Sequence, residues 1–493
     1  MNIRFNRSIF GALIVLLSFV SCDTLKKTDE PYFGNGIHNG WADQNSITIW
    51  TRLTTIPDLN KSGILFKEIP KPASDSLARI YDKETFHSLQ IPEGATLDQM
   101  DGSCPGTAGE VKLTYYPQND RSDKIETKWN AVDPSKNFTK QWRLTGLTAS
   151  TSYAVEILAR KDEQSVVSDT IKGVFKTAAS KTNEDTINFS IVTGHDYNRR
   201  DNLENGHQIY NTMLNDDLDF YAHTGDIEYY DKPFPYASTE ELMRFKWDRL
   251  FALPFQRKFY TNTTSYFIKD DHDVLKNDSN PGMTYGKVSF ERGLEIFDEE
   301  QFPSTNGTYK TVRWGKNLQI WIVDGRKFRS KNASEDGPDK SIWGQKQKQW
   351  LFKTLEESDA TYKVLISATP ILGPDRGKKN DNHANIGFQH EGDEVREFFN
   401  KFDNLFLCVG DRHWQYVSHV DDTNLWEFSC GPGADKHASG WRQSDLRPEH
   451  KFLRVKGGYL FGSVYEENGT PKIKFEHRDV DGNVVNTEIF PKL

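Results

Sequence analysis

The sequence predicts an α/β protein whose N-terminal half is all β, and two observations support this. Up to about residue 178, short alternating segments are separated by polar turns, which is typical of half-buried strands. After residue 185, apolar segments end in loops that carry Asp and His, with helical stretches between them. The chain has 493 residues, enough for two or three domains at roughly 150 residues each.

Composition and charge exclude several classes of protein. Aromatic residues make up 13% of the chain, and disordered chains lack these residues. The formal net charge is −9, which gives no general attraction to nucleic acid or to anionic lipid. We therefore expect no specific nucleic-acid partner.

The first residues have the pattern of an export signal. Two arginines precede an apolar run over 9–20, which is the length of a signal-peptide core and short for a bilayer span. Cys22 follows a small residue, and polar sequence begins at once. The segment resembles a bacterial lipoprotein signal, which implies that 1–21 is removed, that lipidated Cys22 is the membrane anchor, and that 22–32 is a linker. The expected location is periplasmic or on the cell surface; an ordinary secretory signal is the alternative.

Residues 33–178 are predicted to form a β-sandwich. The strand candidates are 46–53, 111–116, 142–160 (a strand, a tight turn and a second strand) and 173–177. The last two resemble the end of a fibronectin type III or immunoglobulin-like domain. In that resemblance Tyr153 is the corner tyrosine whose hydroxyl bonds back to the backbone. Residues 58–106 look like a long insertion, and no catalytic cluster is visible in this half.

Residues 186–493 are predicted to form the second, α/β domain. Its strand candidates are 187–193, 218–223, 318–323, 362–367 and 405–409, and its helix candidates are 203–215 and 342–357. Cys408 lies in one of these apolar runs, so we expect it to be buried. With Cys104 and Cys430 it leaves an odd number of cysteines after Cys22, which is no disulfide framework.

Polar clusters follow the predicted strands. They are GHD at 194–196, GDIEY at 225–229, DDHD at 270–273, DGR at 324–326 and GDRH at 410–413. Open α/β sheets bind ligands where the carboxyl ends of their strands converge. Several carboxylates brought together there would repel one another unless cations compensate them. The sequence therefore predicts a pair of metal ions, and the oxygen and imidazole donors suit Fe, Mn, Zn or Ca.

The order of these clusters resembles the alkaline phosphatase D (PhoD-like) family of the metallophosphatase superfamily. GDIEY is similar to the family's GD-x-x-Y motif, DDHD to its DDH(D/E) motif, VDGRKFR at 323–329 to its D-x-R-x-x-R strand end, and GDRHW at 410–414 to its last metal motif. The resemblance implies a two-sheet αββα sandwich and a hydrolase acting on phosphate monoesters or diesters. In that family a hydroxide activated by two metal ions attacks phosphorus. For this chain the resemblance implies two metal ions, with Fe(III) and Ca(II) as the expected pair and Zn or Mn as alternatives.

The resemblance also implies roles for individual residues. Asp226 would bridge the two metals, and His272 would stabilise or protonate the leaving oxygen. The remaining implied ligands are Tyr229 (a phenolate, which favours Fe(III)), Asp271, Asp324, Asp411 (which either binds metal or orients it) and His413. Arg326 either contacts phosphate oxygens or pairs with a local carboxylate, and the sequence leaves both open.

One departure from the family concerns the first strand. PhoD-like proteins commonly carry a Cys after it, whereas this chain has Gly194, His195 and Asp196. Either His195 or Asp196 could replace the thiolate as a metal ligand, and the sequence does not choose between them.

Two alternative functions stay open at this point. One is a cell-surface binding protein whose phosphatase domain has decayed, and the departure at 194–196 is what supports it. The other is a nuclease on the same scaffold, which the net charge disfavours. The segments 232–262 and 374–395 look like insertions that shape a cleft, and basic residues within 375–390 could bind a polyanionic substrate or form a solvated loop.

Overall fold

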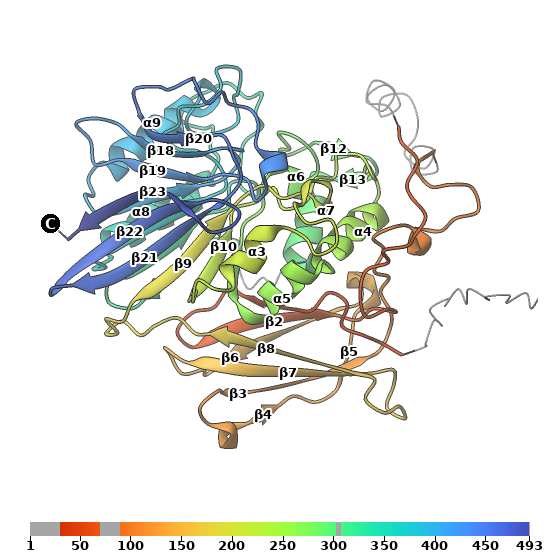
Figure 1. Cartoon of the computed structure of the whole chain (residues 1–493). Helices are drawn as coiled ribbons and strands as arrows, with labels where there is room; N and C mark the ends of the chain where they lie inside the picture. The colour runs from red at the N-terminus through yellow and green to blue at the C-terminus, as the bar shows by residue number, and fades with distance from the viewer. Residues whose placement is uncertain (1–29, 70–88, 302–306, 493) are drawn as a thin grey trace, which may run out of the picture.

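The computed structural model describes residues 30–69, 89–301 and 307–492 (Figure 1). Cys22, the predicted signal and most of the predicted linker lie outside these residues. Two large sheets pack face to face, with helices on their outer sides (Figure 1). This confirms the mixed α/β prediction.

The first sheet has nine strands. In spatial order they are β23 (Val484–Pro491), β22 (Thr470–Arg478), β21 (Tyr459–Glu467), β9 (Ile187–Val192), β10 (Phe220–His223), β11 (Thr264–Phe267), β1 (Ile37–Gly40), β2 (Ser46–Arg52) and β6 (Thr139–Thr145). The neighbours β9, β10 and β11 run parallel. Their carboxyl ends, and the loops that follow them, therefore lie at one edge of the sheet.

The second sheet has seven strands. Their order is β14 (Lys310–Trp314), β15 (Leu318–Ile322), β16 (Tyr362–Ser367), β17 (Leu405–Val409), β19 (Trp426–Cys430), β18 (Gln415–His419) and β20 (His450–Arg454). Every residue of β16 and β17 is buried, as expected for parallel strands covered on both faces. Cys408 is among them, and Cys104, Cys408 and Cys430 are free thiols.

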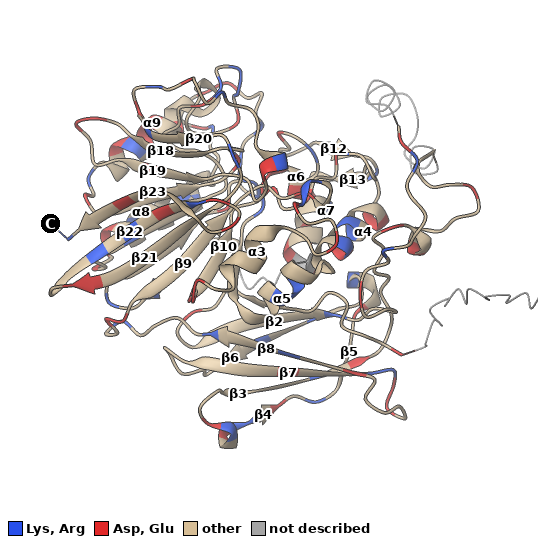
Figure 2. Ribbon diagram, viewed as in Figure 1, with Lys and Arg blue, Asp and Glu red and all other residues tan. Residues whose placement is uncertain are grey.

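Alternate side chains along each strand belong to different apolar layers, one between the two sheets and one under the outer helices. Phe189, Phe220 and Phe406 belong to the apolar layer between the two sheets. Tyr221 and Leu407, each next along the chain, face the outer helices, because successive side chains of a strand point to opposite faces. In Figure 2 the inner strands are mostly tan, and charged residues lie mainly on helices, loops and strand ends.

Helices cover both outer faces. On the first sheet lie α3 (Gln208–Met213), α4 (Glu240–Phe251), α5 (Pro254–Asn262), α6 (Asp271–Val274) and α7 (Phe290–Glu295), with the short hairpin β12 (Thr284–Tyr285) and β13 (Val288–Ser289). On the second lie α8 (Gly344–Glu356) and α9 (Gln389–Phe399). No helix of the described residues is long and apolar enough to cross a membrane.

The N-terminal strands do not form a separate body. β1 pairs in parallel with β11, so β1, β2 and β6 extend the nine-stranded sheet. A smaller sheet of β4 (Ile125–Glu126), β3 (Glu110–Pro117), β7 (Ser152–Arg160) and β8 (Asp169–Lys176), with β5 (Asn130–Ala131) paired to β3, shares an apolar core with this extension. The fibronectin-like or immunoglobulin-like identity and the boundaries of this half stay predictions. The Tyr153 hydroxyl does accept a hydrogen bond from the Thr148 backbone N–H at 2.9 Å, which confirms the predicted corner contact.

Most predicted strands are confirmed, but helices were missed. The predicted insertion 232–262 contains α4 and α5, and 374–395 contains the start of α9. The cap signals of α4 are present: the Thr239 side chain accepts from the Leu242 N–H, and two glutamates occupy the first turn. The predicted helix 203–215 is shorter because residues 202–206 form a turn in which Gly206 has φ +119°.

Candidate metal centre

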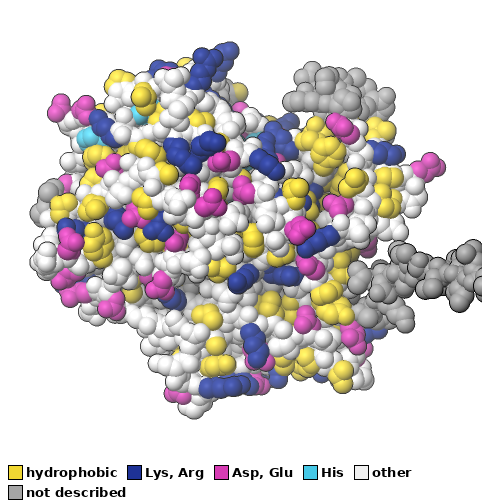
Figure 3. All heavy atoms as spheres, in the orientation of Figure 1, with side chains coloured by type: hydrophobic (Ala, Val, Ile, Leu, Met, Phe, Trp, Pro, Cys, Tyr) yellow, Lys and Arg dark blue, Asp and Glu magenta, His cyan; other side chains and the backbone are white. Residues whose placement is uncertain are grey.

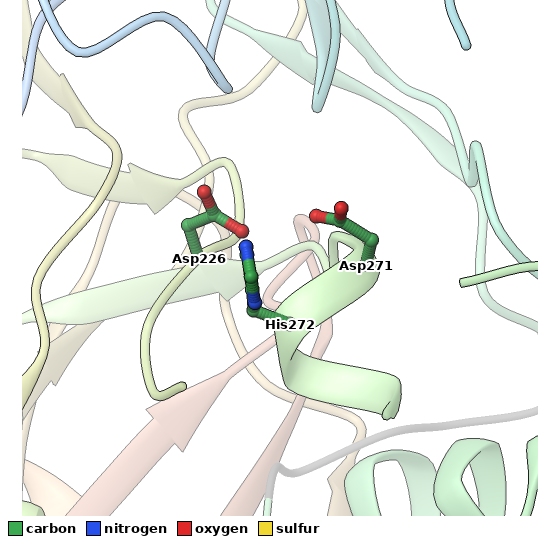
Figure 4. A group of neighbouring side chains, drawn as sticks. All are labelled: Asp226, Asp271 and His272. Atoms are coloured by element: carbon green, nitrogen blue, oxygen red, sulfur yellow. The ribbon is translucent and has the colours of Figure 1, made fainter. Parts of the chain in front are cut away.

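Three loops bring the central side chains to one edge of the sheets. Asp226 follows β10, Asp271 and His272 begin α6, and His413 follows β17 of the other sheet. Figure 4 shows the polar ends of Asp226 and His272 close together, with Asp271 turned toward the same space. The loop after β9 is joined to the Asp226 loop through the backbone, since the His195 N–H donates to the Asp226 carbonyl at 2.8 Å.

A carboxylate that the sequence analysis did not assign holds the Asp226 loop in place. Asp273 accepts hydrogen bonds from four backbone N–H groups, those of Asp226 (2.7 Å), Ile227 (2.8 Å), Glu228 (3.1 Å) and Asp270 (2.9 Å). Asp226 has φ +57°, a left-handed conformation that Asp tolerates better than most residues. The fourth residue of DDHD is therefore a positioning residue for the second motif.

Asp226, Tyr229 and His413 converge. The Tyr229 hydroxyl donates to Asp226 Oδ2 at 2.8 Å and lies 3.1 Å from His413 Nε2, which is 3.4 Å from the same Asp226 oxygen. Burial and the Asp226 charge raise the pKa of the Tyr229 phenol well above its ordinary value. Tyr229 would therefore act as a phenolate ligand only beside a strong cation.

Asp226 is also shared by two groups of possible ligands. Their ligand atoms lie within 4.8 Å of one another in the sets Asp226–Asp271–His272 and Asp226–Asp270–Asp411. Asp226 Oδ1 and Asp270 Oδ2 are buried and have no hydrogen-bond partner. Burial is the main cause that raises the pKa of Asp411 to about 7. Buried oxygens without partners, converging on one carboxylate, fit bound cations.

His272 is held by a second carboxylate that the sequence analysis missed. Its Nδ1 lies 2.7 Å from Asp231 Oδ1, and both side chains are largely buried. Burial alone would lower the pKa of His272, but Asp231, Asp271 and Asp226 outweigh it and raise that pKa to about 10. His272 is therefore a cation in this arrangement and can donate a proton from its other nitrogen.

Arg326 and Arg412 pair with carboxylates, which is one of the two alternatives left open for Arg326. Arg326 is fully buried; its Nε donates to Asp270 Oδ1 at 2.6 Å, and its Nη2 forms an ion pair with the same oxygen at 2.5 Å. Arg412 is also fully buried, between Asp375 (2.5 Å) and Asp411 (2.6 Å). Both guanidinium groups are buried and ion-paired, which favours the second alternative for Arg326, in which it positions Asp270.

Asp324 does not join the other predicted ligands. Its Oδ2 pairs with Lys269 Nζ at 2.9 Å, and its Oδ1 accepts the backbone N–H groups of Arg326 and Lys327 at 2.9 Å each. Asp324 thus shapes its own loop and neutralises a buried lysine, and it has no place in either ligand group.

Neither candidate for the missing thiolate lies among the ligands. The His195 ring lies against Tyr210 and His207, and its Nδ1 is 2.6 Å from His223 Nε2. Asp196 Oδ1 accepts the Asn198 N–H at 3.0 Å and its Oδ2 lies 3.4 Å from Arg199 Nε. Both side chains have other partners and neither is in the ligand groups, so the structure does not support His195 or Asp196 as the replacement ligand.

The fold and the strand-end carboxylates define a protein with a metallophosphatase-type architecture. The solved structure of PhoD has a TM-score of 0.65, with 17% identity, and the match covers 93% of this chain and 90% of that one. Purple acid phosphatase PPD1 from yellow lupin (Lupinus luteus) seeds has a TM-score of 0.60 and 11% identity over 92% of this chain and 73% of its own. Both likenesses concern the fold.

Sequence comparison matches part of the chain to a known family. Residues 296–475 match the family model described as PhoD-like phosphatase. Alkaline phosphatase D of Bacillus subtilis (strain 168) is 26% identical over 190 residues, which are 31% of this chain and 31% of that protein. These matches support the PhoD-like family that the motifs predicted. The aligned part spans about a third of the curated relative, so activity and substrate are proposals.

Proposed function

We propose that this protein is a metal-dependent phosphohydrolase that cleaves phosphate esters. The observation that carries the proposal is Asp226: one buried carboxylate is shared by two ligand groups and also contacts Tyr229 and His413. The metal ions would be held by Asp226, Tyr229, Asp270, Asp271, Asp411 and His413. When bound, they polarise phosphoryl oxygens and lower the pKa of a water molecule.

The chain's own residues supply the rest of the chemistry. Asp231 keeps His272 protonated and oriented, so that its Nε2–H can pass a proton to the leaving oxygen. Arg326 fixes Asp270 and Arg412 fixes Asp411 through buried ion pairs. Asp273 holds the Asp226 loop. These contacts hold the ligands in place before substrate arrives, which reduces the reorganisation that the reaction requires.

Arg199 is our candidate for binding the phosphate. Its guanidinium lies 5.4 Å above the Tyr229 ring, its side chain is 29% exposed, and its one ion pair among the described residues is the 3.4 Å contact with Asp196. A partly exposed arginine beside the ligand cluster can offer its fork of donors to phosphate oxygens. On the face shown in Figure 3, acidic and basic side chains are interspersed, so this face has no large basic patch for a long polyanion.

Hydrolysis of two model esters tests the function. p-Nitrophenyl phosphate and bis-p-nitrophenyl phosphate are offered to the protein loaded with Fe, Ca, Mn or Zn. Asp226→Asn should abolish metal-dependent turnover. Asp248→Asn should retain it, because that buried aspartate pairs with Arg52 at 2.9 Å and is outside the site. The ester that is hydrolysed faster distinguishes a monoesterase from a diesterase. If folded, metal-loaded protein hydrolyses neither ester, that result supports the alternative of a binding protein.

We also propose that the protein is exported and anchored through Cys22. The support is the sequence pattern: an apolar core over 9–20, a small residue and then Cys22. Labelled palmitate should enter the wild-type protein in bacterial cells and be absent from Cys22→Ser. Equal labelling of both proteins would contradict the proposal.

A further inference from the structure

Gly194 occupies the position from which a first-strand ligand would reach the metals. A Cβ added to Gly194 would lie 3.4 Å from His413 Cδ2, 3.6 Å from His413 Nε2 and 3.4 Å from His437 Cε1. Any side chain here would enter the space between the two imidazoles. Glycine offers no donor, and the side chains of His195 and Asp196 are engaged elsewhere. The cluster of Asp226, Tyr229 and His413 therefore lacks a ligand from the first strand.

His437 lies beside this gap and belongs to none of the sequence motifs. Its ring centroid is 4.1 Å from that of His413 and 5.2 Å from that of Tyr229. The side chain is 1% exposed. It comes from the loop after β19, more than two hundred residues from Gly194 in sequence.

The hydrogen bonding of His437 prepares it as a ligand. Its Nδ1 lies 2.9 Å from the His195 carbonyl oxygen, and a carbonyl can only accept. Nδ1 therefore carries the proton, and Nε2 of the neutral ring has a free lone pair. This Nε2 is buried and has no hydrogen-bond partner. Histidines that bind metals are commonly fixed in this way, with a backbone carbonyl on the other nitrogen.

The backbone also ties the His437 loop to the first-strand turn. The Gly433 N–H lies 2.9 Å from the Gly194 carbonyl and 3.1 Å from the Thr193 carbonyl, and Thr193 bridges to Pro432. The Ser439 N–H donates to the His413 carbonyl at 3.2 Å. His437 is thus held against both Gly194 and His413.

We propose that His437 is a metal ligand that replaces the first-strand donor missing at Gly194, completing a set with Asp226, Tyr229 and His413. This deepens the proposed function and rests on it. Like His413, His437 is in neither of the groups with 4.8 Å spacing, and it joins the set through its ring contacts with His413 and Tyr229. Imidazole, phenolate and carboxylate donors suit a transition metal such as Fe or Zn.

Metal content in matched histidine variants tests the proposal. His437→Gln keeps an N–H that can donate to the His195 carbonyl but removes the imidazole. His477→Gln is the control, because His477 is also buried and bonds a carbonyl, that of Ser429, at 3.0 Å outside the site. Metal per chain and chelator competition are measured with Fe and with Zn, beside circular dichroism. We expect His437→Gln to bind the metal at least about tenfold more weakly and His477→Gln to match the wild type.

A rescue variant keeps the test specific to the replaced ligand. Gly194→Asp should restore metal affinity in the His437→Gln protein. Aspartate tolerates φ +57° at position 194, since Asp196, Asp226 and Asp411 already adopt φ values of +70°, +57° and +59°. Wild-type affinity in folded His437→Gln, or no recovery in the folded double variant, would overturn the proposal. Wild-type protein that takes up neither metal would overturn the proposed function with it.

Discussion

Asp273 Oδ2 accepts the backbone N–H of Asp226 at 2.7 Å, so one carboxylate of the third motif fixes the central residue of the second. Asp273→Asn replaces an acceptor by an NH₂ group that faces other N–H donors. We expect the free energy of unfolding to fall by at least about 2 kcal/mol and metal affinity to fall with it. Thermal unfolding and metal titration check this. Asp298→Asn, which alters a mostly buried partner of Lys269 (2.8 Å), should leave metal affinity unchanged.

The strand ends could be predicted from sequence because each buried strand is an apolar run followed by polar residues. The same pattern does not show which of the residues at those strand ends lie among the metal ligands. Asp226 and Asp324 both lie within a few residues of a strand end. Asp324, however, forms an ion pair with Lys269 and does not lie among the ligands. Likewise His195 is one residue beyond Gly194. Only the backbone geometry shows that a side chain at position 194, and not the one at 195, would lie against His413.

The supporting residues were less predictable still. Asp231, Arg199 and His437 reach the site through contacts between loops that are distant in sequence or follow no spacing rule. By contrast, α4 has a readable cap at Thr239 and α5 begins at Pro254. The apolar periodicity of α4 is obscured because the charged residues Lys246 and Asp248 occupy buried positions. Long-range pairing decides such positions, and a single sequence does not show it.

The pair His272–Asp231 predicts a shift in the pH dependence of catalysis. Asp231 is the largest of the carboxylate effects that raise the pKa of His272 to about 10. With Asp231→Asn that pKa falls, so His272 loses its proton at lower pH. The alkaline limb of the kcat profile should move down by at least about one pH unit. A profile unchanged in the variant would show that His272 is not the proton donor.

The proposed phosphate contact of Arg199 predicts that its loss weakens substrate binding more than it slows the chemical step. If it contacts the phosphate, Arg199→Ala should raise KM by about tenfold, the loss expected for a charge-assisted hydrogen bond, with a smaller effect on kcat. Arg200→Ala is the matched control, since Arg200 lies 3.8 Å over the Tyr197 ring and donates to the backbone carbonyls of Leu203 and Tyr197. Steady-state kinetics on the better ester decide; equal KM values for the two variants would remove Arg199 from the substrate site.

Glu391 predicts a pH-dependent contribution to stability far from the metals. It accepts the Ile342 N–H at 2.5 Å and lies 3.0 Å from His383 Nε2. Burial opposes its ionisation, but His383, Ser341 and this backbone contact outweigh it and lower its pKa to about 2 from an ordinary 4.5. Because the folded pKa is the lower one, the charged form stabilises the protein above pH 4.5, by up to about 3 kcal/mol.

That contribution should vanish as the pH falls from about 4.5 toward 2, since Glu391 is then protonated in both states. The measurement is the difference in Tm between wild type and Glu391→Gln across this range. It should be largest near neutral pH and shrink steadily in acid. Glu356→Gln, which alters the last residue of α8, should show a small difference at every pH. A Glu391→Gln difference that stays constant down to pH 3 would contradict the pairing as the source of the stability.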